Sequence, residues 1–202
     1  GGSTVIVGAI LIAFACWALT FGMPLGNFWV KIGLSVIVVT GYSLWWHRPV
    51  IVPRWRSFIL GTVSAIILYF LFYAGNIISA LIFPNAGQQV GGIYGLGHGT
   101  HHLLIFLLLL LVTGPGEEIF WRGFLQDKLM GRFGRLPGYI IATCVYAAVH
   151  VFSGNIILIG AALVAGAFWG AMYMWRKDLF MQIVSHSLWS SFIFAVTPIN
   201  PS

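Results

Sequence analysis

"LLIFLLLLLVTGPGEEIFWRGF", residues 103–124, joins a run of apolar residues to two adjacent glutamates and an arginine. The apolar stretch around it, residues 101–126, exceeds the roughly 20 residues that an α-helix needs to cross a bilayer. Composition agrees, because 59% of the 202 residues are hydrophobic, 7% are charged and the mean hydropathy is +0.95. The sequence therefore predicts an integral membrane protein.

Similar apolar runs occur along the whole chain. In lipid, every backbone polar group must find an internal partner, which leaves α-helices or closed barrels, and these runs lack the alternating pattern of barrel strands. We predict an all-α, polytopic transmembrane helical bundle of about seven spans, forming a single integral membrane domain over residues 1–202. The predicted spans are residues 4–22, 28–46, 57–83, 101–126, 138–153, 155–175 and 179–196.

Basic residues gather in alternate connections between these spans. The other connections, at 22–28, 84–100 and 153–155, carry none, so the basic loops are expected to be cytoplasmic, with the N-terminus inside and the C-terminus outside. A nucleic-acid partner explains the +6 net charge less well, because the charges do not share one soluble face. The basic loop residues are Arg48, Arg54, Arg56, Lys128, Arg132, Arg135, Arg176 and Lys177.

Ionisable side chains inside the spans are the candidates for a site. Such groups are costly in a bilayer and usually face the bundle interior. Counting inward from the cytoplasmic ends at 1.5 Å per residue puts Glu117, His150 and His186 at depths of roughly 16, 20 and 12 Å. One glutamate and two histidines from three helices can therefore converge in one layer.

Two further charged groups lie beside them in the fourth span. Glu118 and Arg122 are four residues apart, which places them on one helix face as a pair. Glu117 points about 100° away from Glu118, so one arginine cannot serve both carboxylates equally. Ser190 follows His186 by one helical turn and adds a hydroxyl.

This set of groups is typical of amide hydrolysis without a covalent enzyme intermediate. A carboxylate and a neutral imidazole can take a proton from water, and a second imidazole with a hydroxyl can donate to an oxyanion. A G-x-S-x-G elbow is absent. Three alternatives remain open: a zinc protease using the same residues, although H-E-x-x-H is absent; proton-coupled transport; and a non-catalytic immunity factor or scaffold.

Three local patterns add structural expectations. "GPG" at 114–116 is expected to kink or interrupt the fourth span; a half-helix starting there, with Thr113 as cap, would favour an ionised Glu117 through its dipole. Gly166 and Gly170 form a small-x-x-x-small pattern that indicates close helix packing within the bundle. "HGTHH" (98–102) has the histidine density of a metal site but no carboxylate nearby.

Three motifs in order carry a family resemblance. "EEIFWR" (117–122) matches E-E-x-x-x-R, "YAAVH" (146–150) resembles F-x-x-x-H with Tyr146 replacing Phe, and "HSLWS" (186–190) resembles H-x-x-x-N with Ser190 replacing Asn. Together they resemble the CPBP family of glutamic intramembrane proteases, relatives of the type II CAAX prenyl endopeptidases and of bacteriocin-processing or immunity proteins. The resemblance covers about residues 101–196, the expected catalytic core.

The resemblance implies a role for each motif residue. It assigns water activation to Glu117 and His150, support of the site to Glu118 and Arg122, and the oxyanion hole to His186 with Ser190. It implies catalysis without metal or cofactor, on a membrane-associated protein or peptide. With the compact size of the chain, it also indicates a bacterial cytoplasmic membrane.

Overall fold

The computed structural model describes residues 2–199, and all regular secondary structure within that range is helical. Seven helical segments of the described chain are long and apolar enough to cross a membrane, which confirms the predicted fold class and span number. Gly1 and residues 200–202 of the predicted single domain lie outside the described residues.

Each predicted span corresponds to one helical segment. The first three are α1 (Gly2–Gly22), α2 (Phe28–Trp46) and α3 (Trp55–Ile82). The fourth consists of α5 (His102–Leu108), the π-helix η1 (Leu109–Thr113), α6 (Gly114–Phe120), the π-helix η2 (Trp121–Gln126) and α7 (Asp127–Phe133). The last three are α8 (Arg135–Ala148) with the 3₁₀-helix η3 (Val149–Ser153), α9 (Ile156–Trp175), and α10 (Leu179–Ser191) with the π-helix η4 (Phe192–Val196).

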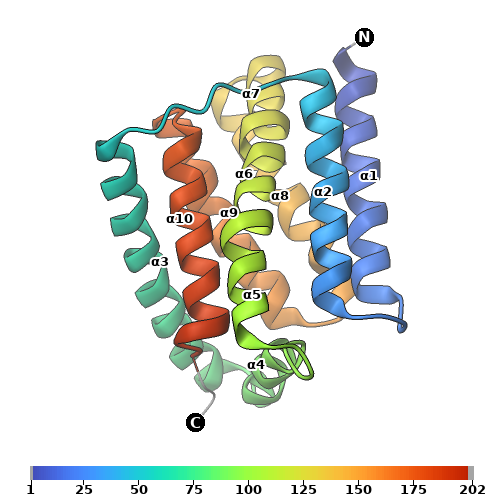
Figure 1. Ribbon diagram of the computed structural model, residues 1–202, viewed down its shortest axis with the longest axis vertical. Helices are drawn as coiled ribbons and strands as arrows, with labels where there is room; N and C mark the ends of the chain where they lie inside the picture. Colours follow the sequence, from blue (N-terminus) through green and yellow to red (C-terminus); the bar gives the residue numbers. More distant parts are fainter. Residues whose placement is uncertain (1, 200–202) are drawn as a thin grey trace.

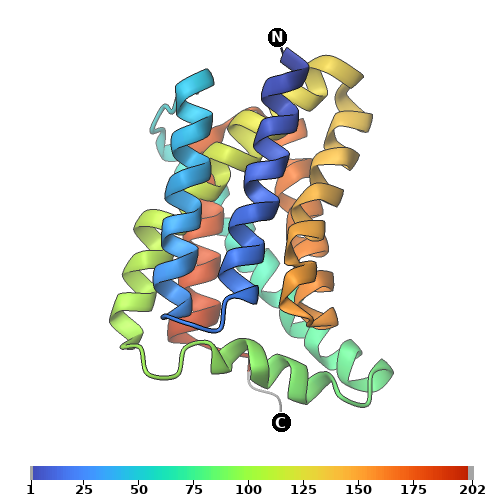
Figure 2. The same cartoon turned by 90° about the vertical axis from the view of Figure 1, so that its right-hand side faces the viewer.

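The segment with both glutamates lies at the centre of the bundle. α6 packs against α2 on one side and against α10 on the other, and α10 in turn packs against α3 (Figure 1). A short additional helix, α4 (Ala86–Gly95), does not span; it lies across the end of the bundle opposite α7 (Figure 2). The site helices are therefore enclosed by neighbours on several sides.

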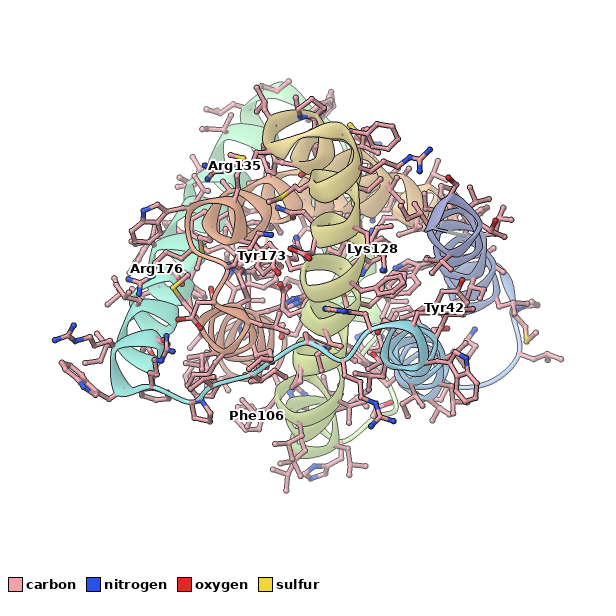
Figure 3. The ribbon with its side chains drawn as sticks, turned by 90° about the horizontal axis from the view of Figure 1, so that it is seen from above. Tyr42, Phe106, Lys128, Arg135, Tyr173 and Arg176 are labelled. Carbon is pink, nitrogen blue, oxygen red and sulfur yellow. The ribbon has the colours of Figure 1, made fainter. Side chains whose placement is uncertain are left out.

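The basic residues lie together at the α7 end. Figure 3 views this end and labels Lys128, Arg135 and Arg176. One boundary prediction is wrong here: the fourth span continues past residue 126 to Phe133, so Lys128 lies in a helix and not in a loop. Gly134, with φ of 95°, separates α7 from α8, because this left-handed conformation suits glycine and ends the helix.

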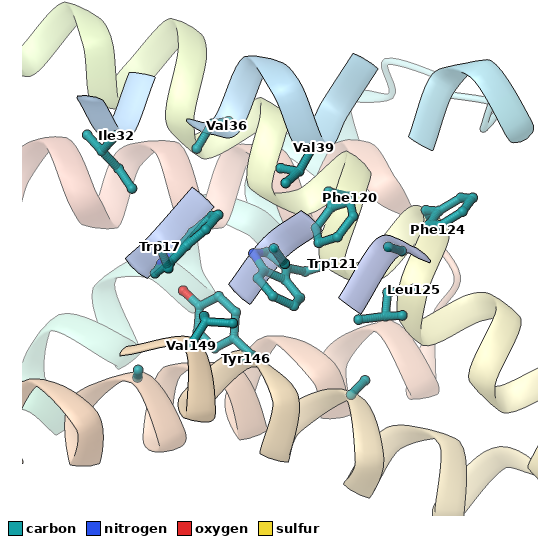
Figure 4. Packing of buried hydrophobic residues seen from close by; sticks show 14 of the residues in the cluster. Trp17, Ile32, Val36, Val39, Phe120, Trp121, Phe124, Leu125, Tyr146 and Val149 are labelled. Atoms are coloured by element: carbon teal, nitrogen blue, oxygen red, sulfur yellow. The ribbon is translucent and has the colours of Figure 1, made fainter. Parts of the chain in front are cut away.

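Aromatic packing fills the core between α1, η2 and α8. The ring centroids of Trp17 and Trp121 are 5.7 Å apart, and those of Trp121 and Tyr146 are 5.2 Å apart, both in edge-to-face geometry (Figure 4). Phe120 and Phe124 extend the same cluster toward the basic end. Edge-to-face aromatic pairs add to van der Waals packing, which holds helices together in lipid. This cluster fixes η2 and α8 beside each other.

The Gly-Pro-Gly sequence does not begin a new half-helix. Thr113 has helical dihedrals (φ −72°, ψ −45°) and makes no side-chain cap, so the expected interruption is wrong. The π-helix η1 replaces it: the N–H of Gly114 donates to the carbonyl of Leu109, five residues earlier. Pro115 has no backbone N–H to donate, and a π-turn accommodates this without breaking the span.

The two glycines of this sequence let neighbouring helices approach α6 closely. A Cβ at position 114 would lie 2.7 Å from Cα of Ser187 on α10. A Cβ at position 116 would overlap a methyl group of Val36 on α2. Side chains at either position are therefore excluded, and the following glutamates lie close to both neighbours.

Candidate active site

Glu118 joins two helices through one carboxylate oxygen. Its Oε1 accepts from Arg122 Nη1 at 3.0 Å, the pair predicted from the i, i+4 spacing, and from His186 Nδ1 at 2.7 Å. Glu118 is fully buried and Arg122 is 2% exposed. Ion pairs that are this buried need additional hydrogen bonds to offset desolvation; His186 supplies one and the Gly166 carbonyl another, while Glu118 Oε2 has no partner among the described residues.

Arg122 is held by backbone and aromatic groups as well. Its Nη2 donates to the carbonyl of Gly166 on α9 at 3.2 Å. Its guanidinium carbon lies 4.8 Å from the ring centre of Tyr146 and 5.6 Å from that of Trp169. The predicted close packing at Gly166 is confirmed, since a Cβ there would lie 2.8 Å from the Tyr146 ring.

Trp169 also orients His186. The two rings stack with centroids 3.9 Å apart and an interplanar angle of 16°. A carboxylate oxygen can only accept, so His186 Nδ1 carries the proton of its bond to Glu118. Stacking and hydrogen bonding together leave Nε2 as the remaining polar atom of this ring.

Glu117 has different neighbours from Glu118. Within residues 2–199 it forms no ion pair, and its Oε2 accepts one hydrogen bond, from the hydroxyl of Tyr146 at 3.3 Å. It is 9% exposed, and that exposure is to a cavity. The divergent directions predicted for the two glutamates are thus present: one carboxylate is paired with an arginine and the other is not.

His150 is oriented by its own helix. Its Nδ1 lies 2.8 Å from the carbonyl oxygen of Tyr146, one turn earlier, so Nδ1 must donate. A neutral His150 therefore presents Nε2 as an acceptor. Among the described residues no hydrogen bond or ion pair joins His150 to Glu117 directly; Tyr146 contacts both, through its carbonyl and its hydroxyl.

Ser190 lies one turn after His186 but its hydroxyl points back along the helix. Its Oγ donates to the carbonyl of His186 at 2.8 Å. This is a common way for serine to satisfy its hydroxyl within a membrane helix. Ser190 thus lies where it was predicted, and its hydroxyl proton is donated to the backbone carbonyl of His186.

One cavity of about 690 Å³ brings these residues together. This volume lies within the usual range of roughly 300–1,000 Å³ for ligand sites. Most of the lining is apolar, with contributions from α1, α2, α3, α4, α8, α9 and α10. The predicted site residues on its wall are Glu117, His150, His186 and Ser190, whereas Glu118 and Arg122 lie behind them.

Two side chains important to this arrangement were not assigned roles from the sequence. Tyr146 contacts Glu117, His150 and Arg122, and its four-residue spacing from His150 was the available signal. Trp169 lies on a uniformly apolar helix, so its stacking on His186 had no sequence signal. Both residues contact the ionisable groups of the site and help to orient them.

The histidine-rich sequence at 98–102 has a structural role in part. His101 is the N-cap of α5, where Nδ1 accepts from the N–H of Leu103 at 3.2 Å. Across residues 2–199, no three His, Cys, Asp or Glu side chains are grouped to hold a metal ion. The predicted absence of a metal or cofactor itself stays a prediction.

Comparison with known proteins finds one family model that matches the region carrying the three motifs. Residues 99–192 match the model of the family described as type II CAAX prenyl endopeptidase Rce1-like. No curated protein and no solved structure matches the chain. The match contains all three motifs and the cavity-lining residues of α6, α8, α9 and α10. Over residues 99–192, slightly less than half of its length, the chain is therefore similar to the Rce1-like type II CAAX prenyl endopeptidases.

Proposed function

We propose that this protein is a glutamic-type intramembrane endopeptidase that hydrolyses a peptide bond of a membrane-associated protein or peptide. The observation that carries the proposal is the pair of neighbouring glutamates with different partners. Glu118 is bound by Arg122 and His186, whereas Glu117 faces the cavity with one hydroxyl contact and, within the described part of the chain, no cation partner. A carboxylate without a cation is suited to accept a proton.

In the proposed first step, Glu117 and His150 position a water molecule in the cavity. His150 Nε2 accepts from this water because Nδ1 is occupied by the Tyr146 carbonyl. Glu117 takes one proton as the water oxygen forms a bond to the carbonyl carbon of the substrate. The carbonyl electrons move to oxygen, giving a tetrahedral oxyanion.

His186 is the proposed donor to this oxyanion. Its Nδ1–H is already used by Glu118, so donation from Nε2 requires the doubly protonated imidazolium form. Glu118 accepts from Nδ1 in that form too, and Arg122 and Trp169 keep both groups in place. Ser190 contributes a second donor only if its hydroxyl leaves the His186 carbonyl.

Collapse of the tetrahedral species completes the proposed reaction. The carbon–nitrogen bond breaks, and the leaving nitrogen takes the proton that Glu117 received from water. Glu117 returns to its ionised state, and no covalent bond to the protein forms. Residues 101–196 are the proposed catalytic core, and the other three spans enclose the cavity with aromatic and apolar side chains.

The chain is a multi-pass membrane protein, and we place it in the cytoplasmic membrane with the basic end inside. Eight of its ten Lys and Arg residues lie at the α7 end of the bundle or in the loops there. With the basic end in the cytoplasm, the C-terminal end of the last span faces outside. α4 then lies at the external surface (Figure 2).

Membrane proteomics tests the proposed function directly. Cells producing the wild-type protein are compared with cells producing Glu117→Gln at equal levels. New N-termini within or beside transmembrane segments are expected in the wild-type cells alone. Identical sets of N-termini in both cell lines would contradict hydrolysis by Glu117.

A further inference from the structure

α3 packs against the bundle along half of its length. Near the basic end, Ser64 Oγ donates to Ser185 Oγ of α10 at 2.8 Å, and Ser57 bonds to Asp178. Of the described residues of α3, none after Leu68 is buried. The second half of this 28-residue helix, toward Ile82, therefore packs only loosely on the bundle, mainly through Phe72, whose ring centroid lies 4.8 Å from that of Trp189.

The cavity reaches the lipid-facing surface at this place. Its wall includes the second half of α3 and the first half of α9. Ile78 and Ile156, one from each helix, line the cavity and are nevertheless 51% and 54% exposed. The cavity thus has a lateral mouth between α3 and α9, in the half of the bundle away from the basic residues.

α4 covers the same cavity toward water. Val90, Ile93 and Tyr94 of α4 line it. Tyr94 donates to the carbonyl of Ile193 at 3.1 Å, and Asn155 Nδ2 donates to the carbonyl of Gln89 at 2.8 Å. These bonds hold α4 across the end of the bundle, so the mouth between α3 and α9 is the more open route.

The cavity wall is almost free of formal charge. Residues 57–116, which include α4, α5 and the part of α3 from Ser57 onward, contain no Asp, Glu, Lys or Arg. Of the described lining residues, Glu117 is the one acidic side chain and none is Lys or Arg. A charged substrate residue would lose its hydration here without gaining a counter-ion, which is strongly unfavourable.

Asn76 is the exception on the apolar second half of α3. Its side chain lines the cavity and has no hydrogen-bond partner among residues 2–199. An unpaired amide at membrane depth is costly unless something satisfies it. An amide offers both a donor and an acceptor, which match one peptide unit of an extended chain; a hydrocarbon chain offers neither.

The register of α3 and α10 gives the offset between Asn76 and the site along the bundle axis. Both helices run in the same direction, and Ser64 lies level with Ser185. Asn76 is twelve residues beyond Ser64 and His186 one residue beyond Ser185, so Asn76 lies about 16 Å farther along the bundle. An extended peptide spans that distance with about five residues.

We propose that the substrate is an uncharged, extended peptide segment that enters from the leaflet opposite the basic loops, between α3 and α9, and whose backbone is held by Asn76 about five residues from the cleaved bond. This inference rests on the proposed function for the identity of the cleaved bond. It assigns to Asn76 a substrate-positioning role, and to the cavity a selection against charged residues near the cleavage site.

Equilibrium binding tests the proposal apart from catalysis. The full-length Glu117→Gln protein in lipid nanodiscs is titrated with a short, fluorescent, uncharged apolar peptide. Adding Asn76→Ala should raise Kd on the order of tenfold, because one buried hydrogen-bonded contact is lost. Asn85→Ala, an exposed asparagine outside the cavity, is the matched control and should leave Kd unchanged.

A charged peptide and a lipid probe complete the experiment. The same peptide with one central residue replaced by Lys should bind far more weakly to the Glu117→Gln protein. Equal Kd values with and without Asn76→Ala, or equal binding of the Lys peptide, would overturn the proposal. The proposal would also be overturned if a prenylated cysteine displaced the peptide and bound with the same Kd with and without Asn76→Ala. That result would identify a hydrocarbon chain as the occupant of the cavity.

Turnover separates a positioning role from a structural one. In the otherwise wild-type protein, Asn76→Ala should raise KM with a smaller effect on kcat and no change in thermal unfolding. Normal cleavage with an unchanged KM would refute the role of Asn76 and leave the proposed hydrolysis intact. Peptide binding as expected without any cleavage by the wild type would instead refute the proposed function.

Discussion

The hydroxyl of Tyr146 lies 3.3 Å from Oε2 of Glu117, and the carbonyl of the same residue accepts from His150. Tyr146→Phe removes the first contact and keeps the second. We expect the variant to stay folded and to lose about tenfold in kcat/KM, the effect of one hydrogen bond to a charged group. Cleavage of a model peptide and thermal unfolding in detergent measure both quantities.

Tyr146→Ala is the contrasting variant. It also removes the ring that lies 4.8 Å from the Arg122 guanidinium and fills the space beside Gly166. The melting temperature should fall together with activity. A Tyr146→Phe variant as inactive as Glu117→Gln would show that the hydroxyl has a larger role than orienting the carboxylate.

Breaking the Glu118 network should destabilise the protein. Glu118→Gln leaves Arg122 and His186 without their carboxylate, and breaking a buried pair from one side costs roughly 3 to 5 kcal/mol. Lower yield and a lower melting temperature are expected, with loss of activity because His186 is no longer held as a donor. Arg122→Gln should lower stability similarly.

The double variant distinguishes pairing from simple loss of packing. Glu118→Gln combined with Arg122→Gln should be more stable than the sum of the two single effects predicts, since neither charge is then left alone. Strict additivity of the two losses in unfolding experiments would mean that the 3.0 Å ion pair contributes little to folding.

The spans and the motif residues within them could be predicted from the sequence, because polar residues are easily recognised within long apolar runs. Glu118 and Arg122 were paired correctly, since i, i+4 spacing is local information. The contact between Glu118 and His186, 68 residues apart, was expected only as convergence of helices at one depth. Which of the two glutamates His186 would contact depends on helix rotation, and spacing alone does not determine it.

Backbone irregularities could not be predicted from the same information. The π-helices at Leu109–Thr113 and Trp121–Gln126 change the rotation of the fourth span on both sides of the glutamates. Pro115 signalled a disturbance there, but a kink, a break and a π-turn all accommodate proline. The exposure of the second half of α3 had no signal either, because that half is as apolar as the buried spans.

Purified protein is expected to contain no stoichiometric zinc. Both histidines use Nδ1 in other hydrogen bonds, and within residues 2–199 no three His, Cys, Asp or Glu side chains are grouped to hold a metal ion. Elemental analysis of the detergent-solubilised protein measures the metal content. About one zinc per chain, with activity lost on chelation and restored by zinc, would establish the metalloprotease alternative.

The orientation in the membrane is tested by cysteine labelling in intact cells. In a background with Cys16 and Cys144 replaced by Ala, a cysteine at Gln88 should react with an impermeant reagent. A cysteine at Arg132 should react only after the cells are opened, since the basic end is expected to be cytoplasmic. Labelling of both positions from the same side would contradict the seven-span topology.

Glu117→Gln is the most direct test of the central claim, that this carboxylate activates the attacking water. The change preserves shape and removes the proton acceptor, so cleavage of a model peptide should fall by a factor of about 10² to 10⁴ or more. Thermal unfolding of the same preparation should match the wild type, because Glu117 forms no ion pair within residues 2–199. Normal cleavage by a folded Glu117→Gln protein would contradict the account.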